Sequence, residues 1–578
     1  MSRRIWSIVL LAATFAAGVS ASAGNAVRRL DAAPVDVSEK GFTVRLEIEL
    51  SDVKADEALY SAGPVKLYLR RAGLDKELLK YDSMSGNYLN FPMPDGGCPV
   101  IEAVIAEKAG RVGIPLALFA ASGGVHRVTI DYSPVKWAIA AGGHVDEDFP
   151  VPASPVRWPD DACERIESKR VHAASFISPS VPGVIPVQTG PKRITRSIQY
   201  WTPDGFNQWV GDVAPGTFNG KLHLFYLIDR RHHGSGAGTG RHQFAHLVTD
   251  DLVNWTELPL AVPIEESWQT CGTGTPFMKE GRLALAFGWH TSRYPEFKGK
   301  PLGGTYTVSD DGVAFTKSGV IITDAQNPSI YNMPGGGYEL VTSYGGEIGI
   351  YRSKDLLKWE LFDAKLPFRG DCPSLFDWHG HRYLLQGFYR MAYNPDGSAG
   401  GFTDWTNEPD KLYEGLSVPM VTSWKGNRRI YIGWMRHLGG WGGWLVFREL
   451  VYHPDGRLGM KWVPEIEPPV PPRVFRVKGG EAFSAVFASE SGAPDLRLSV
   501  DPAKRTADWK DEAKDAKFTN ACEAMNVRIG AVRGLDADYE VKVIAYYDAK
   551  SDATLFDAEI AGGRTLICRR PGKYRASE

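Results

Sequence analysis

The fold of the central part of this chain is decided by the stretch TDDLVNW at residues 249–255. The same template recurs as SDDGVAF at 309–315 and SKDLLKW at 353–359: a Ser or Thr, any residue, Asp, Leu or Gly, two residues and an aromatic. Ser, Thr and Asp side chains can accept hydrogen bonds from turn amides, and the aromatic ring can then pack against a sheet. The shared aspartates fall at 251, 311 and 355, which indicates a repeat of 44 residues, or 60 with a longer loop.

Strand-like runs accompany these turns. Apolar and aromatic residues cluster at 222–226, 283–287, 382–386 and 429–433. Five short-stranded units between residues 200 and 466 are typical of a five-bladed β-propeller, in which each blade is a small antiparallel sheet. We therefore predict an all-β protein whose region 200–466 is a five-bladed β-propeller.

The flanking regions also alternate apolar and polar residues, as β-strands do. FTVRLEIEL at 42–50 is one example, and VKWAIAAGGHVDE at 135–147 resembles the strand-turn-strand of laminin G and concanavalin-like sandwiches. We predict an N-terminal β-sandwich over 25–150 and a proline-rich linker over 151–199. After the prolines of 468–472, we predict a short C-terminal β-sandwich over 474–578.

The first residues have the pattern of a secretory signal. Arg3 and Arg4 precede an apolar run at 5–19, and small residues end in an A-x-A-like site at 21–23. The run is too short for a membrane span, so we predict a signal peptide over 1–23 and a secreted or periplasmic protein with no transmembrane segment. A net charge of -2 gives no electrostatic reason to expect a nucleic acid partner. The oligomeric state is left open.

The chain has six cysteines, an even number that is compatible with an oxidising compartment. Pairing within the flanking domains could join Cys98 to Cys163 and Cys522 to Cys568, although spacing alone does not fix connectivity. Cys271 and Cys372 are expected to be free, buried thiols.

Seven segments of the 200–466 region carry further information. In chain order they read GKLHLFY (220–226), HQFAH (242–246), DLVNWTELP (251–259), CGTGT (271–275), DCPSLF (371–376), IGWM (432–435) and REL (448–450). This series resembles glycoside hydrolase family 32, the invertases, levanases and inulinases, with CGTGT at its Cys-x-Ser-Gly-Ser segment and DCPS at its Glu-Cys-Pro-Asp motif. The resemblance implies a propeller that hydrolyses glycosidic bonds with two carboxylates, and we expect no cofactor.

Two aspartates are the expected catalytic residues. On the family pattern the nucleophile lies about a dozen residues before the HLFY segment, and Asp212 precedes His223 by 11 residues. Asp371 stands at the family's glutamate position and is the expected acid/base, with a side chain shorter by one methylene. Carboxyl groups about 5–5.5 Å apart would give retention of configuration through a covalent intermediate. The alternatives are a turn carboxylate at Asp212 and a structural ion pair of Asp371 with Arg369, while Asp204 is interpreted as a structural turn residue.

Other residues are candidates for contact with the sugar. Asn327 stands where the family has the Asp of an Arg-Asp-Pro motif, so it can bond a hydroxyl but brings no charge. The segment DRRHH at 229–233 could grip an anionic sugar or form a solvated loop. We predict no metal site, because the histidines at 232, 233, 242 and 246 have no specific ligand spacing. The predicted substrate-binding residues are Asn327, Trp434, Arg369, Asp229, His232, Trp289 and Thr273. Further candidates for the aromatic wall of the pocket are Trp441, Trp444 and His290.

The leading hypothesis is an exported, retaining glycoside hydrolase. It would release a terminal sugar, with β-fructofuranosyl favoured, from oligo- or polysaccharides. The neutral side chain of Asn327 supports an alternative in which the same scaffold hydrolyses another furanose or an anhydro sugar. A third hypothesis is a non-catalytic glycan-binding propeller.

Overall fold

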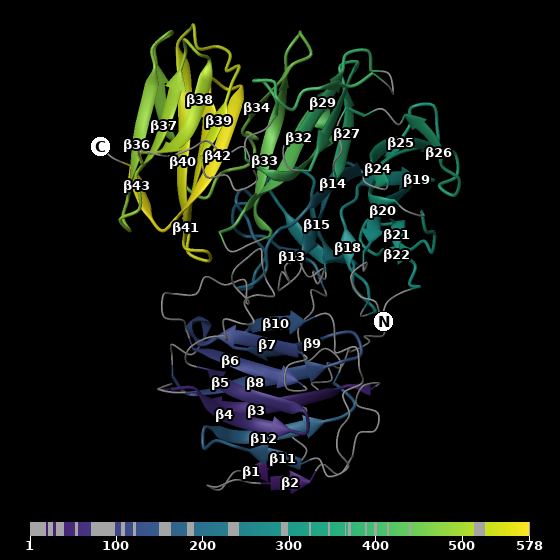
Figure 1. The fold of residues 1–578 in the computed structure, drawn as a ribbon, viewed down its shortest axis with the longest axis vertical. Coiled ribbons are helices and arrows are strands. Elements are labelled where there is room, and N and C mark those ends of the chain that lie inside the picture. Colours follow the sequence, from purple (N-terminus) through teal and green to yellow (C-terminus); the bar gives the residue numbers. More distant parts are fainter. Residues whose placement is uncertain are drawn as a thin grey trace, which may run out of the picture. The chain divides into compact units, whose positions relative to one another are not determined.

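The computed structural model divides the chain into two compact units, whose described residues lie within 19–181 and within 190–576. It contains almost only β-strands, as predicted (Figure 1). Within the part of the chain described, no helix is long and apolar enough to cross a membrane. The described residues are 19–20, 27–29, 40–51, 56–70, 99–105, 110–119, 123–148, 163–181, 190–228, 242–266, 268–290, 299–322, 325–344, 347–363, 366–367, 371–387, 390–397, 401–412, 415–438, 441–513 and 526–576.

The first unit consists of two six-stranded antiparallel sheets, ordered β1-β12-β3-β8-β9-β10 and β2-β11-β4-β5-β6-β7. The alternation predicted at 42–50 forms β3, whose apolar residues from Phe42 to Ile48 are buried. The bounds are β1 Val19–Ser20, β2 Val27–Arg29, β3 Phe42–Glu49, β4 Glu57–Ala62, β5 Val65–Arg70, β6 Val100–Ile105, β7 Gly110–Pro115, β8 Val125–Tyr132, β9 Trp137–Ala141, β10 His144–Asp148, β11 Cys163–Ile166 and β12 Val171–Ile177.

The prediction of a linker over 151–199 is wrong for two of its segments. β11 pairs with β2 and β4, and β12 pairs with β1 and β3, so both complete the sheets of the first unit. A third strand in this range, β13 (Lys192–Arg193), belongs to the second unit and pairs with β17. These strands satisfy their backbone hydrogen bonds with partners far away in sequence, which proline content does not reveal.

The second unit begins with five antiparallel sheets in chain order, drawn in teal and green in Figure 1. The four predicted strand runs lie in β15, β20, β28 and β32. The bounds are β14 Val213–Phe218, β15 Lys221–Ile228, β16 Gln243–Thr249, β17 Thr256–Val262; β18 Cys271–Gly272, β19 Pro276–Lys279, β20 Arg282–Trp289, β21 Gly303–Ser309, β22 Thr316–Lys317; β23 Gln326–Asn332, β24 Tyr338–Tyr344, β25 Glu347–Ser353, β26 Glu360–Asp363; β27 Pro373–Trp378, β28 His381–Gln386, β29 Arg390–Asn394, β30 Thr403–Asp404; β31 Ser417–Trp424, β32 Arg428–Arg436, β33 Gly443–Tyr452 and β34 Leu458–Lys461.

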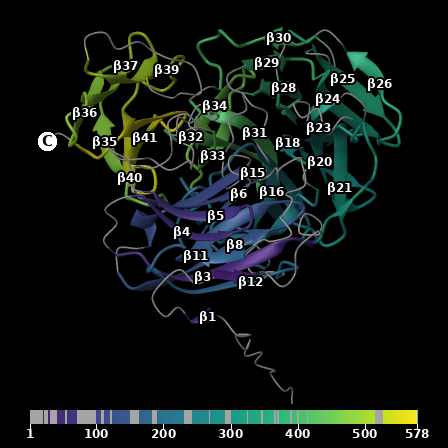
Figure 2. The same cartoon turned by 60° about the horizontal axis from the view of Figure 1, so that its bottom comes forward.

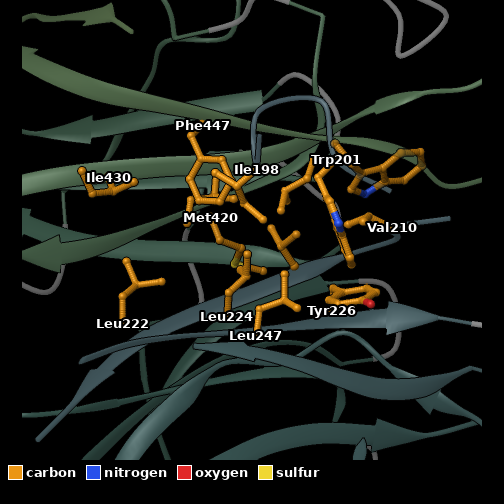
Figure 3. Packing of buried hydrophobic residues seen from close by; sticks show 14 of the residues in the cluster. Ile198, Trp201, Val210, Leu222, Leu224, Tyr226, Leu247, Met420, Ile430 and Phe447 are labelled. Carbon is orange, nitrogen blue, oxygen red and sulfur yellow. The ribbon is translucent and has the colours of Figure 1, made fainter. Parts of the chain in front are cut away.

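Strands β14, β19, β23, β27 and β31, one from each sheet, contact one another in a closed cycle, and we call them the inner ring. The cycle closes where the first sheet meets the fifth. There Leu222, Leu224 and Leu247 of the first sheet pack against Met420 and Ile430 of the fifth (Figure 3). Burial of such side chains contributes roughly 1.5–3 kcal/mol each, so the closure is a large apolar contribution to stability.

The repeated turns form as predicted. The Asp251 carboxylate accepts from the backbone amides of Val253 and Asn254 at 2.8 and 2.7 Å, and the amide of Leu252 donates to Thr249 Oγ1 at 3.0 Å. The turns of the second and third sheets repeat this set of bonds. The residue after the Asp has φ near +70° in all three, at Leu252, Gly312 and Leu356, which explains why one copy uses Gly.

A buried histidine pair lies in the first sheet. His223 Nδ1 and His246 Nε2 are 2.9 Å apart, and Phe225 stacks on His246 with ring centroids 4.3 Å apart. Burial lowers the pKa of His223 from 6.5 to about 4 and holds that of His246 well below its ordinary value. Both imidazoles are therefore neutral at pH 7 and resist protonation while the domain is folded.

This pair predicts a loss of stability in acid. As pH falls from 6.5 towards 4, the unfolded chain takes up protons that folded His223 cannot, which costs about 1.4 kcal/mol of unfolding free energy per pH unit. Asn in the His223→Asn variant can still bond His246 but does not titrate. We expect its melting temperature to fall less between pH 7 and pH 4.5 than that of the wild type. The account is wrong if the melting temperature falls equally in the wild type and in His223→Asn. It is also wrong if replacement of the exposed His379 by Asn reduces that fall as much as His223→Asn does.

The C-terminal region forms two further sheets, ordered β35-β40-β41-β42 and β39-β38-β37-β36-β43. They enclose an apolar cluster that includes Leu498, Trp509 and Phe556. A second cluster joins Leu555 and Ile567 to Trp444 of β33, so this region packs on the fifth sheet (Figure 2). The bounds are β35 Arg473–Val477, β36 Phe483–Ser489, β37 Leu496–Asp501, β38 Thr506–Asp511, β39 Val527–Ile529, β40 Tyr539–Asp548, β41 Ala553–Ile560, β42 Arg564–Pro571 and β43 Tyr574–Ala576.

A fully buried ion pair connects these two parts. Arg448 Nη2 of β33 lies 2.9 Å from Asp557 Oδ1 of β41, and neither side chain is exposed. Tyr200 donates its hydroxyl to Asp557 Oδ2 at 2.5 Å, and Trp462 Nε1 lies 3.3 Å from Oδ1. Arg448 belongs to the REL segment, so this part of the sequence signature has a structural role here.

The cysteines agree in part with the expectations. Cys271 and Cys372 are buried free thiols, as predicted. Cys568 is also a buried free thiol, and its expected partner Cys522 lies outside the described residues, as does Cys98.

Candidate active site

The polar residues singled out from the sequence meet at the starting ends of the inner-ring strands. Asp212 directly precedes β14, Thr273 lies between β18 and β19, and Asn327 is the second residue of β23. Asp371 and Cys372 directly precede β27. Because the inner-ring strands contact one another, these five side chains form one cluster.

Asp212 is held from three sides. Thr273 Oγ1 donates to its Oδ2, Trp434 Nε1 donates to its Oδ1 at 3.3 Å, and the Cys372 thiol lies 3.8 Å from Oδ2. Only 9% of Asp212 is exposed. Burial raises the pKa of this carboxyl and the neighbouring charge of Asp371 adds to the effect, although the Thr273 bond opposes it. The Asp212 carboxylate is therefore held in a fixed orientation at a buried site that destabilises its ionised form.

Asp371 is exposed and lies on the other side of Cys372. Its Oδ1 accepts from the Cys372 amide at 2.9 Å and from Asn327 Nδ2. Its backbone carbonyl accepts from Gln386 Nε2 at 2.7 Å. Cys372 and Asn327 have φ of 51° and 46°, in the left-handed region that non-glycine residues rarely adopt, and such strain is commonly found at functional sites.

Two histidines complete the cluster. His290 Nε2 lies 3.2 Å from Asn327 Oδ1, and His242 stacks on Trp441 with ring centroids 4.2 Å apart. Trp441 also meets Trp434 edge-on, with ring centroids 5.7 Å apart; Trp434 is 1% exposed and Trp441 is only partly buried. Trp441 and His290 were candidates for the aromatic wall of the pocket, whereas His242 had been considered only as a metal ligand. The ring of Trp441 packs directly on Gly211, where a Cβ would lie 1.8 Å from it, so only glycine fits at that position.

The other predicted site residues have mixed outcomes. Thr273 and Trp434 contact Asp212, and Asn327 contacts Asp371. Trp289 must be corrected: its ring lies 6% exposed in the apolar core with Phe287 and Trp268, and the following residue, His290, faces the cluster instead. Successive residues of a strand point to opposite faces, which accounts for this one-residue error. Three predicted residues lie outside the described parts of the chain: Asp229, His232 and Arg369.

The histidines weighed as metal ligands have other partners where they are described. His246 belongs to the buried pair with His223, and His242 stacks on Trp441. In the described ranges, no group of three or more His, Cys, Asp or Glu side chains is arranged to hold a metal ion.

Part of the second unit matches a known protein family. Residues 207–414 match the glycosyl hydrolases family 32 N-terminal domain. The matched region contains Asp212, Thr273, Asn327 and Asp371, and the match confirms the resemblance drawn from the sequence.

Individual relatives are distant. Sucrose-6-phosphate hydrolase of Escherichia coli is 24% identical over 301 residues, which cover 43% of this chain and 61% of that enzyme. Levanase of Bacillus subtilis is 26% identical over 292 residues, 42% of this chain and 41% of that enzyme. The chain thus spans less than two thirds of the length of these relatives. A family 32 beta-fructofuranosidase of Bombyx mori aligns in structure with a TM-score of 0.48 and 16% identity, over 66% of this chain and 90% of that one.

Proposed function

We propose that this protein is a glycoside hydrolase in which Asp212 is the nucleophile and Asp371 the general acid/base. The observation that carries the proposal is the pair of carboxylates on either side of Cys372, at the starting ends of two inner-ring strands of a family 32 domain. We further propose that the five consecutive sheets are the blades of a β-propeller, whose open end presents this pair to the substrate.

The mechanism proposed is hydrolysis with retention. Asp371 donates a proton to the glycosidic oxygen while a carboxylate oxygen of Asp212 forms a bond to the anomeric carbon, and the leaving sugar departs with the proton. Ionised Asp371 then takes a proton from water, whose oxygen displaces Asp212 and restores both carboxyl groups. The bonds from Thr273 and Trp434 orient Asp212 for the attack and stabilise it as a leaving carboxylate in the second step.

We propose a terminal sugar of an oligo- or polysaccharide as the group released, with β-fructofuranosyl favoured. The support is the family 32 domain and the names of its relatives, a levanase and sucrose-6-phosphate hydrolases. Trp441 is only partly buried and can supply flat apolar surface for the sugar, whereas Trp434 is 1% exposed and acts on the site through its bond to Asp212. A different furanose or an anhydro sugar is the second candidate, because Asn327 brings no charge to the site and both ends of its amide are engaged, by Asp371 and His290.

The setting of the activity is also proposed. The pattern of residues 1–23 supports export to the periplasm or the medium, where polysaccharides are met. Asp229, His232 and Arg369 are proposed to contact the glycan. The positive charge of Arg369 would favour an anionic or strongly polar sugar.

Replacement of Asp371 tests the role of the acid/base. The Asp371→Asn variant is expected to cleave the preferred fructan or oligosaccharide about 10²–10⁴-fold more slowly than the wild type, because the leaving oxygen must depart unprotonated. The loss should be much smaller for an aryl glycoside of the same sugar, whose leaving group needs little protonation. Initial rates with both substrates measure this difference.

Added azide separates the proposed mechanism from its alternatives. Azide needs no general base, so it should speed turnover of Asp371→Asn by attacking the covalent intermediate and giving a glycosyl azide of retained configuration. An azide product of inverted configuration would contradict retention, and wild-type rates in Asp371→Asn would contradict the assignment of the acid. If the wild-type protein binds glycans tightly without turning over any of them, it is a binding protein and the proposed function is wrong.

A further inference from the structure

We propose that His290, acting through Asn327, is a positioning residue that determines which oxygen of Asp371 carries the proton donated to the leaving group. This inference rests on the proposed function and adds a residue to its machinery that the family motifs do not include.

The first step is the orientation of the Asn327 amide. Asn327 Nδ2 donates to Asp371 Oδ1, so Asn327 Oδ1 faces the opposite way, 3.2 Å from His290 Nε2. An amide oxygen only accepts hydrogen bonds, so the proton of a neutral His290 must lie on Nε2. His290 with that tautomer prevents the amide from turning over, because a turned amide would place two donors against each other.

The second step concerns Asp371. Its Oδ1 accepts two N–H bonds, one from Asn327 and one from the Cys372 amide at 2.9 Å. Donors stabilise the charged form of the oxygen that they contact, so a proton on Asp371 resides on Oδ2. Oδ2 is then the atom that protonates the glycosidic oxygen. A carboxylate at position 327, as in the family motif, would offer Asp371 no donor and would repel it.

The third step is the space made for the histidine. A Cβ at Gly272 would lie 2.0 Å from His290 Nε2 and 2.5 Å from Asn327 Oδ1, and a Cβ at Gly288 would lie 2.9 Å from Nε2. The His290–Asn327 contact is thus possible only because both neighbouring positions are glycine. A larger residue at Gly272 or Gly288 would therefore displace His290 from Asn327.

Burial keeps His290 neutral, as the inference requires. Burial lowers the pKa of its imidazole, and the nearby His242 acts in the same direction, whereas the Asn327 bond and the Asp371 charge oppose the shift. The other titratable groups of the described cluster are Asp212 and the Cys372 thiol, which contact each other next to Asp371. A neutral imidazole can donate from Nε2 without adding a positive charge next to the acid.

The experiment compares His290→Leu with His290→Gln in the full-length protein. On a glycan substrate, His290→Leu is expected to lower kcat about 10–100-fold with KM changed less than about threefold, because only proton delivery is impaired. On the aryl glycoside of the same sugar, the loss should be less than about threefold. Gln can donate an N–H to Asn327 Oδ1, so His290→Gln should recover most of the lost rate. The exposed-histidine variant His379→Asn is the control and should match the wild type.

A direct readout does not depend on turnover. Nitrogen-15 NMR of ring-labelled protein, assigned with His290→Gln, should show His290 as the neutral tautomer protonated on Nε2. Protonation on Nδ1, or equal losses by His290→Leu on glycan and aryl substrates, would overturn the inference while leaving the proposed function intact. If Asp212→Asn and Asp371→Asn hydrolyse the glycan at the wild-type rate, the proposed function itself fails, and the NMR result still decides the His290–Asn327 bond.

Discussion

Replacement of Asp212 by Asn is expected to abolish hydrolysis and at the same time raise the melting temperature at pH 7. The loss of rate should be at least about 10⁴-fold on every substrate, aryl glycosides included, because no covalent intermediate can form. Stability should rise because the folded protein no longer holds an ionised carboxylate that is only 9% exposed. Asn keeps an oxygen for the Trp434 donor at 3.3 Å, and its Nδ2 can donate to the Thr273 hydroxyl.

The pH dependence of this gain follows from the raised pKa of Asp212. Above that pKa the buried carboxylate is charged and destabilises the folded state, so the advantage of Asn is complete at pH 7. As pH falls through the raised pKa towards the ordinary value of 3.8, folded Asp212 takes up its proton and the advantage disappears. In the active wild type, kcat/KM should fall over the same range, because a protonated Asp212 cannot attack.

Asp204→Asn is the matched control. Asp204 lies near Asp212 in sequence, but it is exposed and paired with Lys192 and Arg196. Its replacement should leave the rate unchanged and should not raise the melting temperature. Activity above a tenth of wild type in Asp212→Asn would contradict the nucleophile, and a lower melting temperature at pH 7 would contradict the cost assigned to its burial.

Much of the second unit could be predicted because its signals are local. The turn at 249–255 is built by side chains that bond amides two and three residues away, so its spacing is written directly in the sequence. The same holds for strand runs such as 283–287, where aliphatic and aromatic residues of high β-propensity follow one another. Asp212 and Asp371 were found for a different reason, as positions in family motifs.

The errors come from contacts that are remote in sequence. β12 has prolines before and after it at 159 and 179, and its pairing with β1 and β3, more than a hundred residues earlier, makes it part of a sheet. Trp289 and His290 could not be assigned to faces because β20 is buried on both sides, so its sequence shows no alternation. The His290–Asn327 contact depends on two different sheets and leaves no motif.

The Asp557→Ala variant is expected to lose about 3–5 kcal/mol of unfolding free energy, because it leaves a buried positive charge without its partner. Arg448 of β33 and Asp557 of β41 are both fully buried, so the pair joins the fifth sheet to the C-terminal sheets. The variant also removes the acceptor of the Tyr200 hydroxyl at 2.5 Å. Denaturation in urea, followed by tryptophan fluorescence, measures the loss.

A double variant separates the cost of the unpaired charge from the value of the ion pair itself. In Arg448→Met/Asp557→Leu both charges are gone and apolar volume is kept, so most of the stability should return, since replacing a buried pair by hydrophobic residues is often neutral or better. Asp501→Ala, which breaks a surface pair with Lys504 in the same C-terminal region, should have little effect. If Asp557→Ala lowers the free energy of unfolding no more than Asp501→Ala does, Arg448 does not need its partner. The contact between the fifth sheet and the C-terminal region is then held by its apolar cluster alone.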